Sequence, residues 1–587
     1  MSRTSKDEAT LKYPRIGLAL SGGGFRASIF HLGVIRRLEE LGIMKYVHTI
    51  SAVSGGSIIA AYYVIEMEKR LRQRREELAD NPDRLDEVRL QIFEEIADCF
   101  FQALNHNLRS RAMVFGPFYH PILFLKSLWP SCSRSDIMQK EYDKWFYHDE
   151  TLDHLPSVTL RDNDARSEEE KIPLFFAGPE VVLNTTSLLT GERIGFSRDP
   201  VSRLQELHRV NQNTLKLSKV VGASSGVPGL FPPTTIWGDK LVDGGVADNQ
   251  GIDALVGLDR LLDDEESSAT DRDDFDVLLV SDASGQMEPV HRQGNRAFVV
   301  MGRTFSIFQF QLRRKMLKLL RLWQRNDSSS REFAFVHLFL NLKDRPNTPR
   351  VPSEYIPALG GIRTDLDQFS FIEREVLMYH GYTLIDAQIQ KYCERLKAVI
   401  SNKTGDVPEL AQPPLFLDQP SSDQTTEKCV SETRLRKRVK DVLAVGSGRV
   451  FLYRSWRKHP KKSSGIFGSV LLLLIDGWGW GVGAVQNFLK LFRAFNSQTE
   501  RWLSFAMPDW LQWIVEKVVE NCSFPLDTQV LTDVVWILLW LYIVAFLAYV
   551  AMRRMVRRWD IKDYQTLTDK DYTLHWTTND ASSEDRR

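Results

Sequence analysis

One serine stands where a strand-like run meets a helix-like run, and small residues flank it. The apolar run Lys45–Val53 leads into Ala52-Val53-Ser54-Gly55-Gly56. In a G-x-S-x-G nucleophile elbow, a tight turn exposes the serine hydroxyl above the sheet and small neighbours let strand and helix approach closely. Ala52 replaces the first glycine of that pattern, and the N–H of Gly55 can add to an oxyanion hole. The pattern favours a nucleophilic Ser54; the alternative is a serine that only caps the helix.

A glycine-rich loop lies upstream of this serine, in Ser21-Gly22-Gly23-Gly24-Phe25-Arg26. Because these glycines have no Cβ, their N–H groups can point into one concavity, and the helix that follows adds positive potential. Such a nest binds an anion, either a phosphate or the oxyanion of acyl transfer. The dinucleotide pattern G-x-G-x-x-G and the phosphate-loop pattern G-K-[ST] are both absent.

An aspartate ends the third apolar run, Leu241-Val242-Asp243, and Gly244-Gly245 follow it. Two glycines turn the chain sharply, so this geometry projects a carboxylate from the edge of a sheet. Taken alone, the pattern is typical of a hairpin turn. Three such elements in one chain, in this order, indicate one catalytic site.

The residues between these motifs predict the elements that position them. Apolar runs bounded by glycine predict buried strands, and apolar residues at helical spacing predict helices. The expected strands cover 15–20, 45–53, 174–183, 235–242 and 277–280, and the expected helices cover 27–41, 57–66, 67–97 (solvated), 304–324 (basic and amphipathic) and 371–400. The order strand, helix, strand, helix predicts a parallel sheet with helices on its faces.

Taken together, the motifs resemble the patatin-like phospholipase family over about residues 13–396. The matching residues are Gly22, Gly23, Gly24 and Arg26, His31-Leu32-Gly33, Ser54, Asn184-Thr185-Thr186, Thr190-Gly191, Ala223-Ser224-Ser225, Pro228–Pro233, Asp243-Gly244-Gly245, Ser281-Asp282-Ala283 and Ile362–Asp367. The resemblance implies an α/β fold, a three-layer α/β/α sandwich with a mostly parallel central sheet. It also implies lipid acyl hydrolysis without a metal or an organic cofactor.

The resemblance further implies a catalytic dyad. Ser54 would attack the ester carbonyl and Asp243 would take its proton, with the N–H groups of Gly22, Gly23 and Gly24 holding the oxyanion. Ala52, Gly56, Gly244 and Gly245 would support the two turns. Arg26 is expected either to steady the glycine loop or to attract a lipid phosphate. His31, the histidine nearest the loop, is expected to be structural.

Composition excludes several classes of protein. Lys plus Arg and Asp plus Glu both number 76, so a general nucleic-acid binder is not expected. The five cysteines form no C-x-x-C pair, which argues against a zinc site and a disulfide framework and favours a reducing compartment. The N-terminus has no apolar signal-peptide core.

The C-terminal part predicts a membrane region. Residues 534–552 carry no charge and are long enough to cross a hydrocarbon core, and four arginines follow at 553, 554, 557 and 558. Residues 465–485 form a weaker second span, preceded by lysines and arginines. Two spans would make a hairpin with both basic flanks, and the catalytic domain, in the cytosol.

The predicted layout and function follow. Residues 1–14 form an N-terminal tail, 15–400 the catalytic domain with an insertion at about 67–130, 401–450 a linker, 451–560 the membrane region and 561–587 a polar cytoplasmic tail. The expected protein is an integral membrane hydrolase of phospholipids or lysophospholipids, acting through an acyl-serine. A catalytically inactive membrane scaffold or lipid-binding protein with the same fold is the alternative, favoured by Ala52, and nucleotide binding by the glycine loop ranks third.

Overall fold

The computed structural model describes the predicted catalytic domain in most of its length. The described residues are 14–106, 108, 134–156, 178–199, 205, 214–256, 275–285, 297–325, 331–342, 349–404 and a few positions between 408 and 443. The tails, most of the linker, part of the insertion and both predicted spans, 465–485 and 534–552, lie outside them. Within the described ranges, no helix is long and apolar enough to cross a membrane.

One sheet of eight strands organises the domain. The strands are β1 (Ile16–Leu20), β2 (Val47–Val53), β3 (Glu180–Ser187), β4 (Arg193–Phe196), β5 (Thr234–Ile236), β6 (Asp239–Asp243), β7 (Val277–Asp282) and β8 (Glu332–His337). Their order is β5-β6-β3-β2-β1-β7-β8, with β4 paired to β3. The pairs that join β3, β2, β1, β7 and β8 are parallel, whereas β4, β5 and β6 join antiparallel. The sheet is therefore mixed, with a parallel centre.

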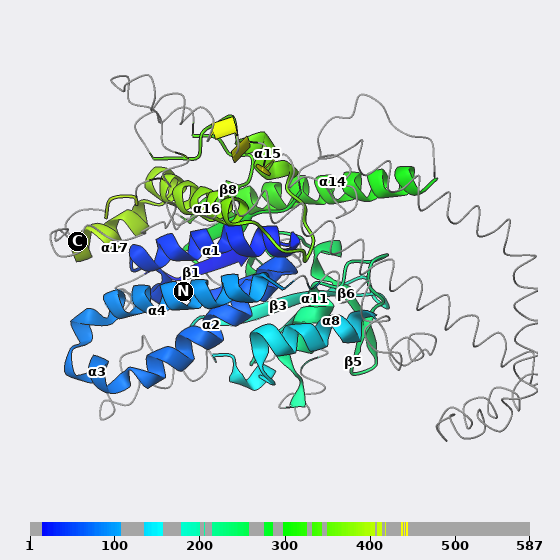
Figure 1. Ribbon diagram of the computed structural model, residues 1–587, viewed down its shortest axis with the longest axis horizontal. Coiled ribbons are helices and arrows are strands. Elements are labelled where there is room, and N and C mark those ends of the chain that lie inside the picture. The colour runs from blue at the N-terminus through cyan, green and yellow to red at the C-terminus, as the bar shows by residue number, and fades with distance from the viewer. Residues whose placement is uncertain are drawn as a thin grey trace, which may run out of the picture. The chain divides into compact units, whose positions relative to one another are not determined.

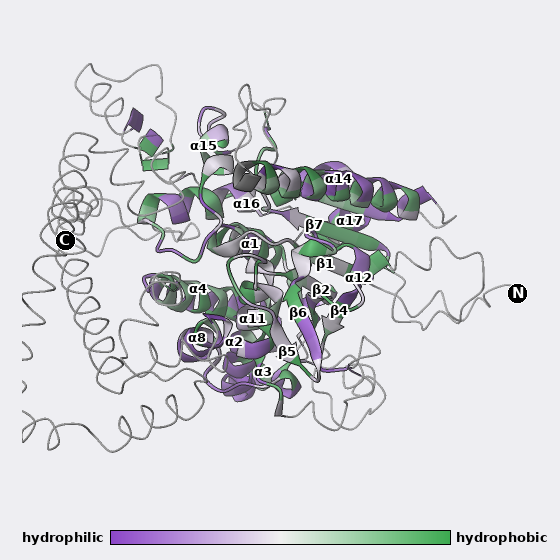
Figure 2. Ribbon diagram, turned by 90° about the vertical axis from the view of Figure 1, so that its right-hand side faces the viewer, coloured by the Kyte–Doolittle hydropathy of each residue, from purple (hydrophilic) through white to green (hydrophobic). Residues whose placement is uncertain are grey.

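Helices lie on both faces of this sheet. The described helices are α1 (Gly24–Glu40), α2 (Gly55–Gln73), α3 (Arg75–Asp80), α4 (Leu85–Leu104), α8 (Arg134–Tyr142), α11 (Leu217–Ser224), α12 (Asp253–Val256), α14 (Ala297–Arg325), α15 (Ile356–Gly361), α16 (Phe371–Tyr392) and α17 (Glu394–Thr404). Helices α1, α2 and α11 lie on one side of the strands and α12 on the other (Figure 2). This arrangement is the three-layer sandwich that the sequence predicts.

The core explains why the central strands are apolar throughout. Every residue of β1 and β7 is buried, because helices cover both faces of a parallel sheet. On the α12 side, Ala19, Leu278 and Val280 pack against α12 and against Met316 and Leu320 of α14. On the other side, α1 lies along α16 and beside α2, and Figure 1 shows α1 between α16 and α4.

Three expected elements differ from the observed ones. The strand expected at 235–242 is a hairpin, because Trp237 and Gly238 both have positive φ, 50° and 87°, and form its two-residue turn. The helix expected at 371–400 is interrupted at Cys393.

The solvated helix expected at 67–97 is wrong. Helix α2 continues to Gln73, and α4 begins at Leu85 and buries Ile92, Phe93, Ile96 and Phe100. Its apolar residues recur at helical spacing, and they pack against α1 and α2.

Candidate active site

Ser54 occupies a strained turn between β2 and α2. Its φ and ψ are 51° and −115°, a conformation that residues with a Cβ rarely adopt. Hydrogen bonds from three elements hold the turn: the N–H of Ser54 donates to Ser224 Oγ at 3.0 Å, and Ser224 Oγ donates to the carbonyl of Asn184 at 2.6 Å. Ser57 Oγ lies 2.8 Å from Ser224 Oγ. The turn therefore presents the serine as the elbow pattern predicts.

The small residues around Ser54 are required by close packing. A Cβ on Gly55 would lie 2.1 Å from the carbonyl oxygen of Gly24, and one on Gly56 would lie 2.4 Å from that of Leu20. Ala52 is fully buried within β2, where it pairs with Leu20 of β1 and Leu183 of β3. Alanine at this position lies in regular sheet, so the departure from glycine does not distort the turn.

The glycine loop touches the elbow, and its donors differ from the expected set. A Cβ on Gly22 would lie 3.1 Å from the Cβ of Ser54. The N–H of Gly22 already donates to the carbonyl of Asn249 at 3.0 Å, so Gly22 supplies space beside Ser54 and no oxyanion donor. Among the described residues, the N–H groups of Gly23, Gly24 and Gly55 have no hydrogen-bond partner.

Asp243 ends β6 next to the elbow. Its Oδ1 accepts a hydrogen bond from the N–H of Gly245 at 2.8 Å, and its carboxyl lies within reach of the Ser54 side chain. Burial raises the pKa of Asp243 to about 6, although the Gly245 N–H and the nearby Ser54 hydroxyl lower it. A Cβ on Gly244 would lie 2.3 Å from the carbonyl oxygen of Asn184, so this turn, too, packs against β3. The structure thus brings the predicted serine and aspartate together.

Arg26 steadies the glycine loop from α1. Its Nη1 donates to the carbonyls of Gly360 at 3.0 Å and Ile362 at 2.6 Å, and its Nη2 donates to that of Ala283 at 3.0 Å. The side chain is buried, so these carbonyls, rather than a lipid phosphate, receive its guanidinium. Of the two roles expected for Arg26, the structure supports the first.

His31 is a structural residue, as predicted. Its Nε2 lies 2.9 Å from the carbonyl of Ser21 and its Nδ1 lies 2.7 Å from Ser281 Oγ. A carbonyl can only accept, so the proton sits on Nε2 and the Ser281 hydroxyl donates to Nδ1. Burial lowers the pKa of His31 to about 4, so its imidazole is neutral at physiological pH.

Two residues near the dyad carry no recognisable motif in the sequence. Asn249 accepts the Gly22 N–H, and its Oδ1 would meet Cβ atoms on Gly22 and Gly245 at 2.3 and 2.5 Å. Tyr142, on α8, places its hydroxyl 3.1 Å from Ser225 Oγ; burial raises the pKa of this phenol, and the nearby Asp243 carboxylate raises it further. Both contacts join segments far apart in the chain. The described residues hold no cluster of His, Cys, Asp and Glu suited to a metal ion.

Comparison with known proteins identifies a family for part of the chain. Residues 18–256 match the family described as patatin-like phospholipase, which confirms the predicted resemblance over that range and supports lipid hydrolase activity. A protein of Saccharomyces cerevisiae assigned as a meiotic phospholipase, SPO1, is 38% identical over 53 residues, which are 9% of this chain and 8% of the yeast protein. The matched segment is therefore a small part of either protein.

Solved structures give weaker likenesses. VipD of Legionella pneumophila has a TM-score of 0.28 at 15% identity, over 78% of this chain and 80% of VipD. Human GIVD cytosolic phospholipase A2 in complex with methyl gamma-linolenyl fluorophosphonate has a TM-score of 0.32 at 13% identity, over 69% of this chain and 61% of the human chain. At these scores the likenesses carry no weight for function.

Proposed function

We propose that the patatin-like phospholipase domain, matched at residues 18–256, hydrolyses carboxylic esters of phospholipids or lysophospholipids with Ser54 as nucleophile and Asp243 as base. The observation that carries the proposal is the placement of these two side chains beside the same Asn249 amide, within reach of each other, with the carboxyl buried and its pKa raised to about 6. Such a carboxylate is a stronger base than an exposed aspartate and is still ionised at neutral pH.

Acylation begins when Ser54 Oγ attacks the ester carbonyl and its proton passes to Asp243. The carbonyl oxygen becomes an oxyanion, and the N–H groups of Gly23, Gly24 and Gly55 are the donors left to hold it. As the tetrahedral intermediate collapses, the bond to the alcohol oxygen breaks and Asp243 returns the proton to that oxygen. An acyl-serine and a free alcohol result.

Deacylation repeats these steps with water. Asp243 takes a proton from a water molecule, the hydroxide attacks the acyl carbonyl, and the proton returns to Ser54 Oγ as the fatty acid leaves. His31 takes no part in this scheme, because its neutral ring is already bonded on both nitrogens. The chemistry needs no group beyond the chain itself.

The two other functions have less support. Nucleotide phosphates would need the glycine loop and Arg26, but the Gly22 N–H and the Arg26 guanidinium already bond carbonyls of the chain. The inactive-scaffold alternative was based on Ala52, and Ala52 lies in undistorted sheet. A hydrolase is therefore the better proposal.

The membrane setting is a proposal from sequence alone. Residues 534–552 are apolar and uncharged, and together with a second span at 465–485 they would form a hairpin that keeps the enzyme beside its lipid substrate with the catalytic domain in the cytosol. Carbonate extraction of membranes and protease protection of intact vesicles test this arrangement. Release of the full chain by carbonate would contradict it.

Labelling and product analysis test the reaction. We expect a fluorophosphonate probe to label the wild-type chain and to spare Ser54→Ala, while Ser401→Ala, exposed on α17, is labelled normally. Fatty acid release from phosphatidylcholine and lysophosphatidylcholine should fall by at least about 10³-fold in Ser54→Ala and Asp243→Asn. Unlabelled wild type, or equal turnover by Ser54→Ala, would refute the proposal.

A further inference from the structure

Helix α14 is the most one-sidedly charged element that the structure describes. Its 29 residues, Ala297–Arg325, contain no Asp or Glu. The cations are Arg303, Arg313, Arg314, Lys315, Lys318, Arg321 and Arg325. The whole chain has equal numbers of acidic and basic residues, so this helix concentrates positive charge locally.

Only the C-terminal half of α14 is packed into the domain. The contact stripe recurs at helical spacing and consists of Gln309, Arg313, Met316, Leu320 and Trp323. The last three are buried against the sheet, and Arg313 Nε lies 2.6 Å from Asp282 Oδ2. The stripe begins at Gln309. Figure 1 shows the N-terminal half of the helix, before this residue, extending beyond the domain.

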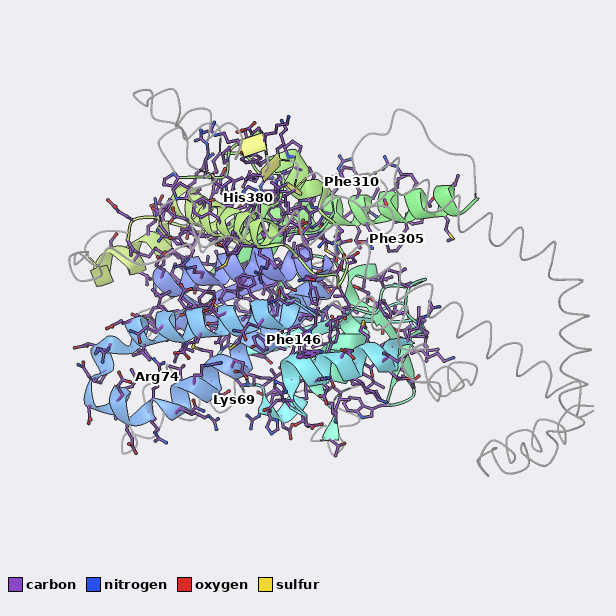
Figure 3. The ribbon with its side chains drawn as sticks, viewed as in Figure 1. Lys69, Arg74, Phe146, Phe305, Phe310 and His380 are labelled. Carbon is purple, nitrogen blue, oxygen red and sulfur yellow. The ribbon has the colours of Figure 1, made fainter. Side chains whose placement is uncertain are left out.

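The extending half is apolar and exposed. Met301, Phe305 and Phe308 lie on one face at spacings of four and three, with 63%, 45% and 67% of their surfaces exposed. Val300 and Ile307 are exposed beside them. Figure 3 labels Phe305 on this extending part of α14. Contiguous exposed apolar side chains next to cations are typical of a helix that lies in a membrane interface.

We propose that the N-terminal half of α14 docks on the surface of an anionic lipid bilayer. Met301, Phe305 and Phe308 would enter the acyl boundary, while Arg303 and the cations from Arg314 onward face the headgroups. Charge complementarity decides the occupant: α14 has no carboxylate, its six cations other than Arg313 fit a negatively charged surface, and the phenylalanines fit the apolar layer beneath it.

Helix α14 contacts the turn that follows Asp243, so docking of the helix would bring the bilayer close to the proposed active site. Gln309 Nε2 donates to the carbonyl of Gly245 at 2.7 Å, and the N–H of Gly245 donates to Asp243. The first residue that anchors α14 to the domain is thus bonded to the turn that carries the proposed base. A bilayer held by the extending half would lie next to the dyad. This benefit rests on the proposed function, but the docking itself does not.

Photo-crosslinking identifies the occupant without using catalysis. The full chain is reconstituted in vesicles of phosphatidylcholine with phosphatidylserine, with benzoylphenylalanine in place of Phe308. We expect lipid adducts at position 308. The matched control places the same residue at Tyr392, which is 48% exposed at the end of α16 and should give few lipid adducts. Adducts from position 308 to other residues of the chain or to a second copy would overturn the proposal.

Turnover measures what the docking contributes. In Phe305→Ser/Phe308→Ser we expect at least about ten-fold slower hydrolysis of vesicle-borne phospholipid, since two large apolar side chains no longer enter the bilayer. Hydrolysis of a water-soluble short-chain ester should be unchanged, and Tyr392→Ser should resemble wild type on both substrates. Equal vesicle turnover by the double variant would overturn the inference. A wild type that cleaves neither ester would instead refute the proposed function and leave the crosslinking result intact.

Charge reversal tests the electrostatic part. Lys318→Glu/Arg321→Glu should abolish the increase in lipid crosslinking that phosphatidylserine gives over phosphatidylcholine alone, and added salt should have the same effect on wild type. Crosslinking that is insensitive to both phosphatidylserine and salt would contradict an anionic bilayer as the partner.

Discussion

At the scale of single residues, burial and hydrogen bonding act in opposite directions on Asp243. Removal from water raises the pKa of its carboxyl, and the Gly245 N–H and the nearby Ser54 hydroxyl lower it, so that the pKa is about 6. A proton acceptor must be ionised to act, so this balance sets the pH range of the proposed reaction. Two predictions follow from it.

The first concerns the rate. The kcat/KM for a soluble ester should fall as pH decreases through about 6, because Asp243 becomes protonated there. The measurement is a pH–rate profile of the wild-type chain. Burial lowers the pKa of His31 to about 4, so kcat/KM would fall near pH 4, and not near pH 6, if His31 were the base. A fall of kcat/KM at that lower pH would therefore argue against the Ser54–Asp243 dyad.

The second concerns stability. The folded-state pKa of Asp243 lies above its ordinary value of 3.8, so its stabilising contribution is complete below that value and is lost as pH rises through about 6. Asp243→Asn removes this loss. Relative to wild type, the variant should gain on the order of 3 kcal/mol in unfolding free energy between about pH 4 and pH 8. Thermal unfolding of both proteins at the two pH values measures it, and a constant difference would contradict it.

The sequence predicted the two dyad residues because each ends an apolar run at a small-residue turn. It could not predict that Asn249 accepts the Gly22 N–H or that Ser224 accepts the Ser54 N–H. Those contacts join segments that are distant in the chain and that no periodicity relates. The sequence consequently could not show that the N–H of Gly22 is already bonded within the chain.

At the scale of elements, the strand-to-helix turn depends on the contact between two loops. The Gly24 carbonyl occupies the space that a side chain at position 55 would need. The glycines of this turn therefore allow α1 and α2 to begin close together, in addition to any role in catalysis. Replacing glycine by alanine at positions 55 and 302 separates this packing effect from the effect of alanine on helix propensity.

Gly55→Ala should destabilise the domain by about 1–3 kcal/mol and reduce turnover on the order of 10²-fold, because the loop must move away from Ser54. Gly302→Ala on α14 has nothing within 4 Å of its added Cβ and should stabilise the helix by about 1 kcal/mol without lowering soluble-ester turnover. Thermal unfolding and esterase assays of both variants check this. Similar behaviour of the two would show that packing at position 55 is unimportant.

Element boundaries were the least predictable part of the fold. The apolar period of α4 is present in the sequence at Val88, Ile92, Ile96 and Phe100, but the surrounding Arg and Glu residues masked it. The Trp237-Gly238 turn was hidden because a tryptophan at positive φ is not a usual turn residue. Its neighbours in the sheet, and not its own propensity, determine that conformation.

At the scale of the whole molecule, a buried ionic network joins the layer of helices on one face. Arg89 of α4 donates to both carboxylate oxygens of Glu39 on α1, at 2.8 and 3.0 Å, and Tyr63 of α2 donates to the same carboxylate. All three side chains are buried. A buried charge that loses its partner costs far more than an intact pair contributes.

Arg89→Met should therefore reduce the unfolding free energy by about 3–5 kcal/mol, since it leaves Glu39 buried and unpaired. Glu39→Leu/Arg89→Met should recover part of this loss, because no unpaired charge remains. Denaturant unfolding of the single and double variants gives both values. A double variant whose loss equals the sum of the two single losses would contradict the pairing argument.

The position of β1 at the centre of the sheet has a consequence for biosynthesis. During translation β1, the first strand among the described residues, must wait for β7 to pair with its second edge, and α1 must wait for α16, which begins at Phe371. Until then the nascent chain shows its most apolar surfaces to the surrounding solution. Chaperone occupancy during translation should persist until the codons for α16 have been read, and a stop placed just after residue 256 should yield a product that proteases remove.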